Sequence, residues 1–198
     1  MAETEENLYD IKRRKQREAV VKAAANLFIE RGHKSVTMDE IASAAGVARR
    51  TLFNYYEGKE DILFDVAAPV LTDATRLALA LSRHSAKSQA GVTLGDIAAL
   101  CLSLWHQHGS SLEIIYTMGL EGSDRVAAFH AGFLDAFRKL MDKCDVGKSA
   151  PGELALAGRI IYRCFVPLLR ALEGVENFDA RFTDAFCCMV RSGIGLGV

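Results

Sequence analysis

Apolar residues recur at helical spacing along most of the chain, and no useful stretch alternates apolar and polar residues with the period of two that is typical of strands. No repeat of 20 to 50 residues and no low-complexity segment is present. The sequence therefore predicts an all-α fold of about nine helices. Their expected ranges are 12–31, 37–45, 48–56, 60–83, 94–108, 111–120, 123–144, 151–172 and 180–192.

Residues 37–59 read TMDEIASAAGVARRTLFNYYEGK and hold two short helices joined by a tight turn. Thr37 followed three residues later by Glu40 is a capping box, which indicates a helix start. The apolar residues from Met38 to Ala45 recur at i, i+3, i+4 and i+7, so one face of the first helix must be buried. Gly46 then ends that helix, since glycine adopts a left-handed conformation most easily. This arrangement is typical of a helix-turn-helix.

The second helix of this unit, about 48–56, divides into two sides. Its inner side is expected to hold Leu52, Phe53 and Tyr56. Arginine, threonine and asparagine on the outer side could contact base edges in a major groove, and tyrosine could reach a phosphate. The outer side holds Arg49, Arg50, Thr51, Asn54 and Tyr55.

The pattern T-x-x-x-I-A-x-x-A-G-V-x-x-x-T-L-F-x-Y-Y-x-x-K-E-x-I-L, from Thr37 to Leu63, resembles the DNA-binding domain of the tetracycline-repressor (TetR) family of bacterial transcription regulators. The motif is specific over residues 16–64, and beyond them only length and helical pattern agree. The resemblance implies a three-helix DNA-binding domain at 10–58 and a helical effector-binding and dimerisation domain at 59–198. Two positions depart from the family: Ala48 replaces a frequent capping serine, and Phe53 replaces a tyrosine that often touches DNA.

Charge is distributed unevenly along the chain. The net charge is −1, but residues 11–59 hold 11 Lys and Arg against 5 Asp and Glu. Cations at Lys12 to Arg17 would open the first helix and oppose its dipole, which an external phosphate would relieve. The alternative is a solvated, charged helix start. The residues expected at DNA are Lys12, Arg13, Arg49, Arg50, Thr51, Asn54 and Tyr55, to which the resemblance adds Thr37, Phe53 and Lys59.

The resemblance also implies an effector cavity among the middle helices. Aromatic and sulfur side chains would form apolar walls there, and histidines would supply hydrogen bonds, so an apolar or aromatic small molecule is the expected ligand. The alternative is that Trp105, Phe129, Phe133 and Phe137 are ordinary core residues. The residues expected to line the cavity are Trp105, His108, Tyr116, Met118, Phe129, His130 and Phe133.

Two further features concern the helices of the second domain. Pro69 lies inside the predicted helix 60–83 and is expected to kink or break it, and residues 84–91 are expected to form a loop. The last two helices carry broad apolar faces, and in the family such helices pair across a two-fold axis as a four-helix bundle. The expected homodimer interface is Ile161, Phe165, Leu168, Leu169, Leu172, Phe182, Phe186 and Met189.

The sequence argues against several other kinds of protein. It contains no catalytic motif that we recognise and no G-x-G after a strand, so we expect neither an enzyme nor a cofactor. His106 and His108 are two residues apart and would not share a metal on a helix. Adjacent Cys187 and Cys188 could sense redox state or a soft metal, although such pairs are more often buried fillers.

The expected location follows from composition. The chain shows no signal peptide and no apolar run long enough to span a membrane, and its five cysteines lack a disulfide framework, so we expect a cytoplasmic protein. The function that these observations favour is a ligand-responsive repressor that leaves a palindromic operator when a small molecule binds. The alternative is an effector-independent, architectural or chromosome-organising DNA-binding protein.

Overall fold

The computed structural model describes residues 7–88, 91–118, 124–144 and 153–193, which form eight α-helices, one 3-10 helix and no strand. This confirms the predicted all-α fold. No helix in the described part of the chain is long and apolar enough to cross a membrane. The elements are α1 (Leu8–Arg31), η1 (His33–Ser35), α2 (Met38–Ala44), α3 (Arg49–Phe53), α4 (Lys59–Ser88), α5 (Leu94–Met118), α6 (Asp124–Met141), α7 (Glu153–Leu172) and α8 (Phe178–Gly193).

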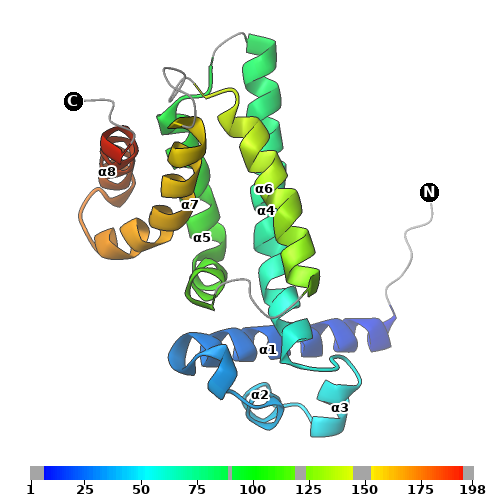
Figure 1. The fold of residues 1–198 in the computed structure, drawn as a ribbon. Coiled ribbons are helices and arrows are strands. Elements are labelled where there is room, and N and C mark those ends of the chain that lie inside the picture. The colour runs from blue at the N-terminus through cyan, green and yellow to red at the C-terminus, as the bar shows by residue number, and fades with distance from the viewer. Residues whose placement is uncertain (1–6, 89–90, 119–123, 145–152, 194–198) are drawn as a thin grey trace.

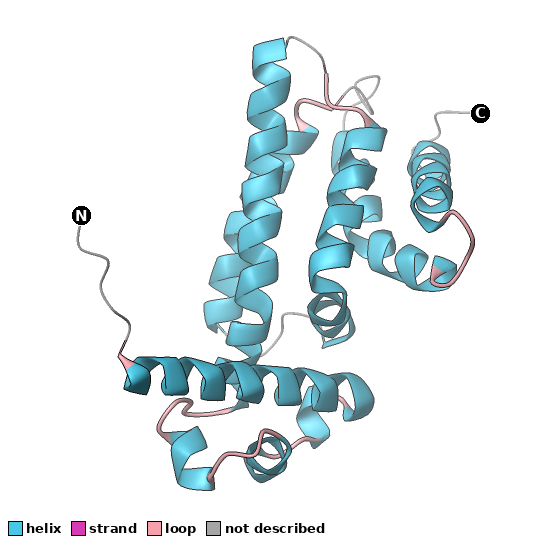
Figure 2. Cartoon of the chain, turned by 180° about the vertical axis from the view of Figure 1, so that it is seen from behind, coloured by secondary structure: helices cyan, strands magenta, loops and turns pink. Residues whose placement is uncertain are grey.

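The helices form two parts, which we call the head (α1, η1, α2 and α3) and the body (α4 to α8). Figure 1 shows α1 lying across the base of the body, with α2 and α3 beneath it. Helices α4 and α6 run side by side along the body, α5 and α7 lie next to them, and α8 packs on the outside of α7. The view from behind shows the same crossing of α1 beneath α4 (Figure 2).

A small hydrophobic core holds the head together and attaches it to the body. Val20, Ala24 and Phe28 follow one another at helical spacing on α1, so a single face of that helix is buried. This face packs on residues of α2 and α3, and also on residues from α4 and α5 that belong to the body. The buried residues of this core are Val20, Ala24, Phe28, Val36, Ile41, Ala42, Leu52, Tyr56, Ile62, Leu63, Val66 and Ile114.

Helix α1 begins earlier than the sequence predicted. It starts at Leu8, and the side chain of Asn7 caps it by accepting a hydrogen bond from the Tyr9 amide at 3.3 Å. The first turn therefore contains Asp10, which suits the helix dipole. Lys12 to Arg17 lie beyond that turn, so their conflict with the dipole is smaller than the sequence suggested.

Helix α4 is continuous through Pro69 and extends to Ser88, so the predicted break and most of the predicted loop at 84–91 are wrong. A proline removes one helical hydrogen bond. Burial on both sides of Pro69 offsets that loss, because Val66, Val70 and Leu71 are all at least 95% buried.

The predicted helices 94–108 and 111–120 correspond to the two segments of α5, which meet at a kink at His108; counted as one element, they give eight α-helices in the described part of the chain. The predicted interruption does exist as a distortion. His108 has φ −138° and ψ 21°, which are not helical values, and the helix resumes after it.

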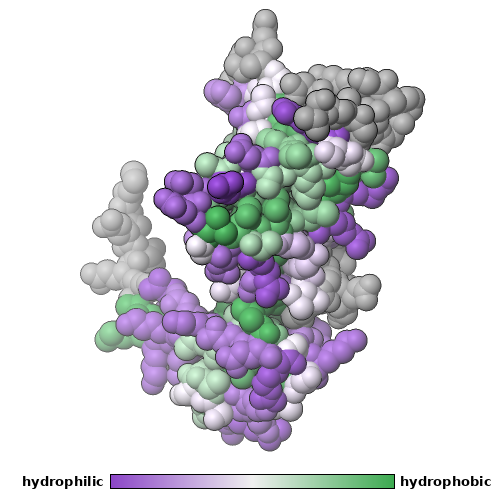
Figure 3. Space-filling model, turned by 90° about the vertical axis from the view of Figure 1, so that its left-hand side faces the viewer, coloured by the Kyte–Doolittle hydropathy of each residue, from purple (hydrophilic) through white to green (hydrophobic). Residues whose placement is uncertain are grey.

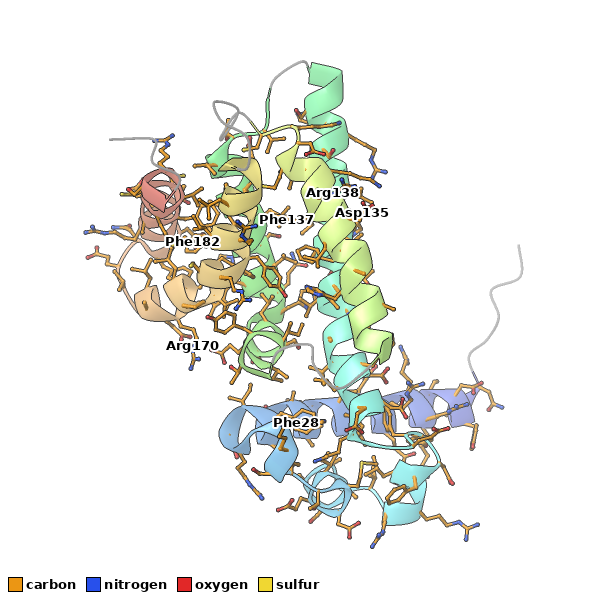
Figure 4. The ribbon with its side chains drawn as sticks, in the orientation of Figure 1. Phe28, Asp135, Phe137, Arg138, Arg170 and Phe182 are labelled. Atoms are coloured by element: carbon orange, nitrogen blue, oxygen red, sulfur yellow. The ribbon has the colours of Figure 1, made fainter. Side chains whose placement is uncertain are left out.

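The two apolar faces of α7 and α8 pack mainly against each other and against α5 within one subunit. Ile161, Leu169, Phe182 and Phe186 are at most 2% exposed, so their assignment to a dimer interface is wrong. Figure 4 shows Phe182 of α8 and Phe137 of α6 on either side of α7. The remaining predicted interface residues, Phe165, Leu168, Leu172 and Met189, are partly buried at the edge of this core.

Candidate nucleic-acid interface

The capping box at the start of α2 is formed as predicted. The Glu40 amide donates to Thr37 Oγ1 at 3.3 Å, and the Thr37 amide donates to Glu40 Oε2 at 2.8 Å. Arg31 Nη2 also donates to Glu40 Oε1 at 2.7 Å. These hydrogen bonds lower the pKa of Glu40 to about 2; the bond from the Thr37 amide has the largest effect, and those from the Thr37 hydroxyl and Arg31 have smaller effects. Thr37, a predicted DNA contact, thus has a structural role at the end of α1 and the start of α2.

Helix α3 is only five residues long, and its N-cap residue Ala48 makes no side-chain capping bond. Leu52 is fully buried, but Phe53 is 45% exposed, so the prediction that Phe53 lies on the inner side is wrong. Successive helical residues point about 100° apart, and Leu52 already fills the core side. The exposed Phe53 ring instead lies under the Arg49 guanidinium, whose central carbon is 5.6 Å from the ring centroid. Arg49 Nη1 also pairs with Asp39 Oδ2 at 2.9 Å.

The outer face of α3 meets the start of α1 at a cleft of about 490 Å³. Tyr55 closes one side of it, because its hydroxyl donates to Gln16 Oε1 at 2.7 Å and its ring lies 5.9 Å from the Arg13 guanidinium carbon. Arg50 and Asn54 are exposed beside it. The cleft brings together five predicted DNA-binding residues and two that the sequence analysis did not consider; its lining is Tyr9, Lys12, Arg13, Gln16, Thr51, Asn54 and Tyr55.

Tyr9 and Gln16 were missed although the sequence carried a signal for them. Tyr9, Lys12 and Gln16 stand at i, i+3 and i+7, so they share one face of α1. The Tyr9 side chain is 70% exposed, which leaves its hydroxyl free to approach a ligand in the cleft.

Lys59 has a structural role that sequence reasoning did not find. Its Nζ donates to the carbonyl oxygens of His33 at 2.8 Å and Lys34 at 3.3 Å, and so it joins the start of α4 to η1. Phosphate binding by Lys59 stays a prediction. The pKa of His33 is lowered mainly by burial and secondly by the nearby Lys59 charge. Its Nε2 has no hydrogen-bond partner among the described residues.

A three-residue network joins the head to α4. Asp65 Oδ2 accepts from Arg17 Nη2 and from the Tyr56 hydroxyl, each at 2.7 Å, and the Arg17 guanidinium lies 5.4 Å from the Tyr56 ring centroid. Burial is the largest cause that raises the pKa of Tyr56 to about 12. Hydrogen bonds of the Arg17 guanidinium with Tyr56 and Asp65, which stabilise its charged form, raise the pKa of Arg17 further above its already high value. Arg17 therefore positions α1 on α4, which we call the connector because it joins the head to the rest of the body.

The cations of the head divide into two groups. Arg17, Arg31 and Arg49 are paired with carboxylates, and these pairs fix the elements. No described carboxylate pairs with Lys12 or Arg50, and these charges remain available to an anion. Figure 3 shows a largely hydrophilic surface over the head, whereas hydrophobic residues gather over the body.

The body contains a cavity of about 820 Å³ between α4, α5, α6 and α7. Of the predicted effector residues, Tyr116, His130 and Phe133 line it. Trp105 and His108 do not. Trp105 packs on the neighbouring cores, and His108 Nε2 hydrogen-bonds to Asp73 Oδ2 at 2.8 Å. The side chains of Met118 and Phe129 lie outside the described residues.

Polar groups gather at one end of this cavity. The Tyr162 hydroxyl and His130 Nε2 are 2.7 Å apart. Burial lowers the pKa of His130 and raises that of Tyr162, so both are neutral near pH 7. Arg163 and Arg170 also line the cavity, and Arg170 Nε pairs with Glu113 Oε1 at 3.0 Å. Figure 4 shows Arg170 on the side of the body that faces the head.

The other residues considered from the sequence show no assembled centre. The described His, Cys, Asp and Glu residues form no group of three that could hold a metal ion. Cys187 is partly buried, Cys188 is exposed, and both are free thiols. Burial raises the pKa of Cys187, which makes it a weaker nucleophile at neutral pH.

Comparison with known proteins relates the head to one family of sequences. Residues 20–66 match the family described as bacterial regulatory proteins, tetR family. A curated protein of Mycobacterium tuberculosis, described as a mycofactocin biosynthesis transcriptional regulator, MftR, is 54% identical over 39 residues. That match covers 20% of this chain and 20% of the relative's length.

Solved structures are similar over most of the chain. The TetR family transcriptional regulator PfmR from Thermus thermophilus has a TM-score of 0.65 at 15% identity, covering 87% of this chain and 97% of that one. SmeT, the repressor of the Stenotrophomonas maltophilia efflux pump SmeDEF, in its complex with triclosan, has a TM-score of 0.59 at 16% identity. This second match covers 89% of this chain and 90% of the other. At these identities the likeness is one of fold.

Proposed function

We propose that this chain, a transcriptional regulator of the TetR family, is a homodimeric repressor that leaves a palindromic operator when a small molecule enters the 820 Å³ cavity. The observation that carries the proposal is that one helix, α4, serves both parts. Asp65 holds Arg17 and Tyr56 of the head, and Val70 and Leu71 line the cavity. Val70 lies five positions after Asp65 on this helix, which is about 7.5 Å along the axis.

The head would bind DNA with two sets of side chains. Arg50, Thr51 and Asn54 on the outer face of α3 would contact base edges, which decides sequence preference. Lys12 and Arg13 at the neighbouring cleft, with the Tyr55 hydroxyl, would contact phosphates, which decides overall affinity and its salt dependence. The observed pairing supports this division, because no described carboxylate neutralises Lys12 or Arg50.

The cavity has the size and composition of a small-molecule site. Its volume lies within the range of about 300–1,000 Å³ that is usual for such sites. A structural neighbour, SmeT, is known in a complex with triclosan, and we extend ligand binding to this chain as part of the proposal. A tenfold to hundredfold loss of operator affinity needs a coupling free energy of about 1.4–2.7 kcal/mol.

The dimer would form through the exposed sides of α7 and α8. The side of the molecule where α8 lies shows hydrophobic residues at its surface (Figure 3). Leu168, Leu172 and Met189 are partly buried there, and Val175 is 41% exposed. A two-fold axis at this face would place two heads on successive major-groove half-sites, whose centres lie about 34–36 Å apart.

The experiment that tests the proposal has two stages. Selection from a random duplex library should recover one short palindrome, and binding to it should show a Hill coefficient or stoichiometry that reports two subunits. Small molecules that raise the melting temperature of the protein are then added to this complex. Release of DNA by a cavity ligand supports the proposal. Binding to many unrelated sequences without a ligand response would favour the architectural protein instead.

A further inference from the structure

We infer that the ligand of the body cavity is an amphipathic anion, with its acidic group bound by Arg163 and its apolar portion held between α4, α5 and α7. This inference rests on the proposed function, since it names the chemical class of the effector for the same cavity. It replaces the uncharged apolar or aromatic molecule that the sequence alone favoured.

One wall of the cavity is apolar and comes from three helices. Leu71 and Ala74 of α4, Leu104 of α5 and Val166 of α7 line it, and each is at most 4% exposed. Phe133 of α6 faces the same space. A ligand segment placed here would leave water for hydrocarbon contacts, which requires that this segment is itself apolar.

The α7 side of the cavity also carries positive charge that is not neutralised by its lining. The described lining contains two arginines and no Asp or Glu. Arg170 is paired with Glu113, which lies outside that lining, and His130 and Tyr162 hydrogen-bond to each other. Arg163 has no carboxylate partner among the described residues.

This distribution of charge selects between ligand classes. A carboxylate or similar group would receive charge-assisted hydrogen bonds from the Arg163 guanidinium, which are about twice as strong as neutral ones. A neutral ligand would leave that guanidinium to water, and a cationic ligand would be repelled. The cavity therefore favours an anion with an apolar body.

Arg159 provides a matched control for Arg163. It lies four residues earlier on α7, is also exposed, and lines a different cavity of about 560 Å³ between α6 and α7. Arg163 lines both cavities, whereas Arg159 is absent from the lining of the larger one. Loss of one positive charge from α7 is thus the same in the two variants, but only one of them changes the proposed site.

The test compares three probes that share a ten-carbon chain, each below its critical micelle concentration: decanoate, decanol and decyltrimethylammonium. Binding to the full chain is followed by calorimetry and by fluorescence of Trp105, the single tryptophan. Decanoate should bind at least about tenfold more tightly than decanol, and the cation should bind most weakly. Arg163→Gln should remove the preference for decanoate without weakening decanol, and Arg159→Gln should keep it.

Other outcomes overturn the inference. Equal or tighter binding of decanol would show a site for neutral ligands, and failure of all three probes would show that the cavity does not take an amphipath. A preference that Arg159→Gln also removes would place the anion elsewhere on α7. Addition of decanoate to the selected operator complex then tests the proposed function separately: binding that leaves DNA affinity unchanged would contradict the repressor mechanism while the ligand class stands.

Discussion

The head and the body use their polar side chains in different ways. In the head, short hydrogen bonds connect Glu40, Arg17 and Asp65 to neighbouring elements, and they hold small helices in place. In the body, long helices pack through apolar side chains, and the polar groups of α7 face a cavity. The head thus presents a fixed surface, whereas the body keeps a space that a ligand can fill.

The largest expected effect concerns the two cores. Phe28→Ala in the head and Phe182→Ala in the body each remove a fully buried ring, which costs about 3–5 kcal/mol of unfolding free energy. If head and body unfold as one unit, both variants should lower the same urea midpoint. Two separate transitions for Phe28→Ala, one of them with unchanged Trp105 fluorescence, would show that the body is stable without the head.

The next effect concerns the two sets of side chains at the proposed DNA-binding surface, one for bases and one for phosphates. Arg50→Ala should change the preferred base at one position of each half-site by about 1–3 kcal/mol. Lys12→Ala should weaken binding to all DNA sequences alike. It should also reduce the slope of log binding constant against log salt concentration by about 1. Site selection and salt titrations on both variants measure this. Unchanged base preference in both, with equal loss of affinity, would contradict the assignment of separate roles.

A smaller effect is expected at the network between head and connector. Asp65→Asn removes the charge that holds Arg17 and weakens the bond to Tyr56, and should lower the unfolding free energy by about 1–2 kcal/mol, since Arg17 is 43% exposed. Operator affinity should fall further than stability predicts, because α1 is then less well oriented. The control is Asp135→Asn on α6 (Figure 4). Its partners Arg138 and Lys139 are exposed, so these pairs should contribute little.

The smallest expected effect is on the pH dependence of stability, which should differ between the head and the body. Burial lowers the pKa of His130, so the unfolded chain binds more protons, and the body loses stability as pH falls below about 6.5. Glu40 has a pKa of about 2 against an ordinary value of 4.5, so its contribution is present above pH 4.5 and is lost between 4.5 and 2.

Urea titrations at several pH values measure both losses. His130→Gln should flatten the change below pH 6.5, and Glu40→Gln should flatten only the change below pH 4.5. If the two variants flattened the same range, the shifts of pKa would be assigned to the wrong residues.

The same contrast explains what could be predicted from the sequence. The capping box of Thr37 and Glu40 and the burial of Leu52 depend on neighbours within one or two turns, and both were predicted correctly. The network of Arg17 with Asp65 joins residues 48 positions apart, and no local pattern indicates it. The exposure of Phe53 was missed because α3 is shorter than its apolar pattern suggests.

The lining of the body cavity depends on how helices are rotated about their axes, which composition does not set. His108 was expected at the cavity, but the backbone distortion at this residue directs its ring to Asp73 on α4. Tyr116, His130 and Phe133 do line the cavity, and effector binding by them stays a prediction. Arg163 was not considered because a charged residue on an amphipathic helix usually faces solvent.

Pro69 determines where the connector is least stiff. Proline has no amide hydrogen, so the Asp65 carbonyl oxygen lacks the bond that it would accept from position 69 in an ordinary helix. Pro69 directly precedes Val70, the first residue of α4 that lines the cavity. Asp65, at the other end of the missing bond, is the residue whose carboxylate holds Arg17. Bending of the 30-residue helix therefore costs least at this level, between the contacts of Asp65 with the head and the residues of α4 that line the cavity.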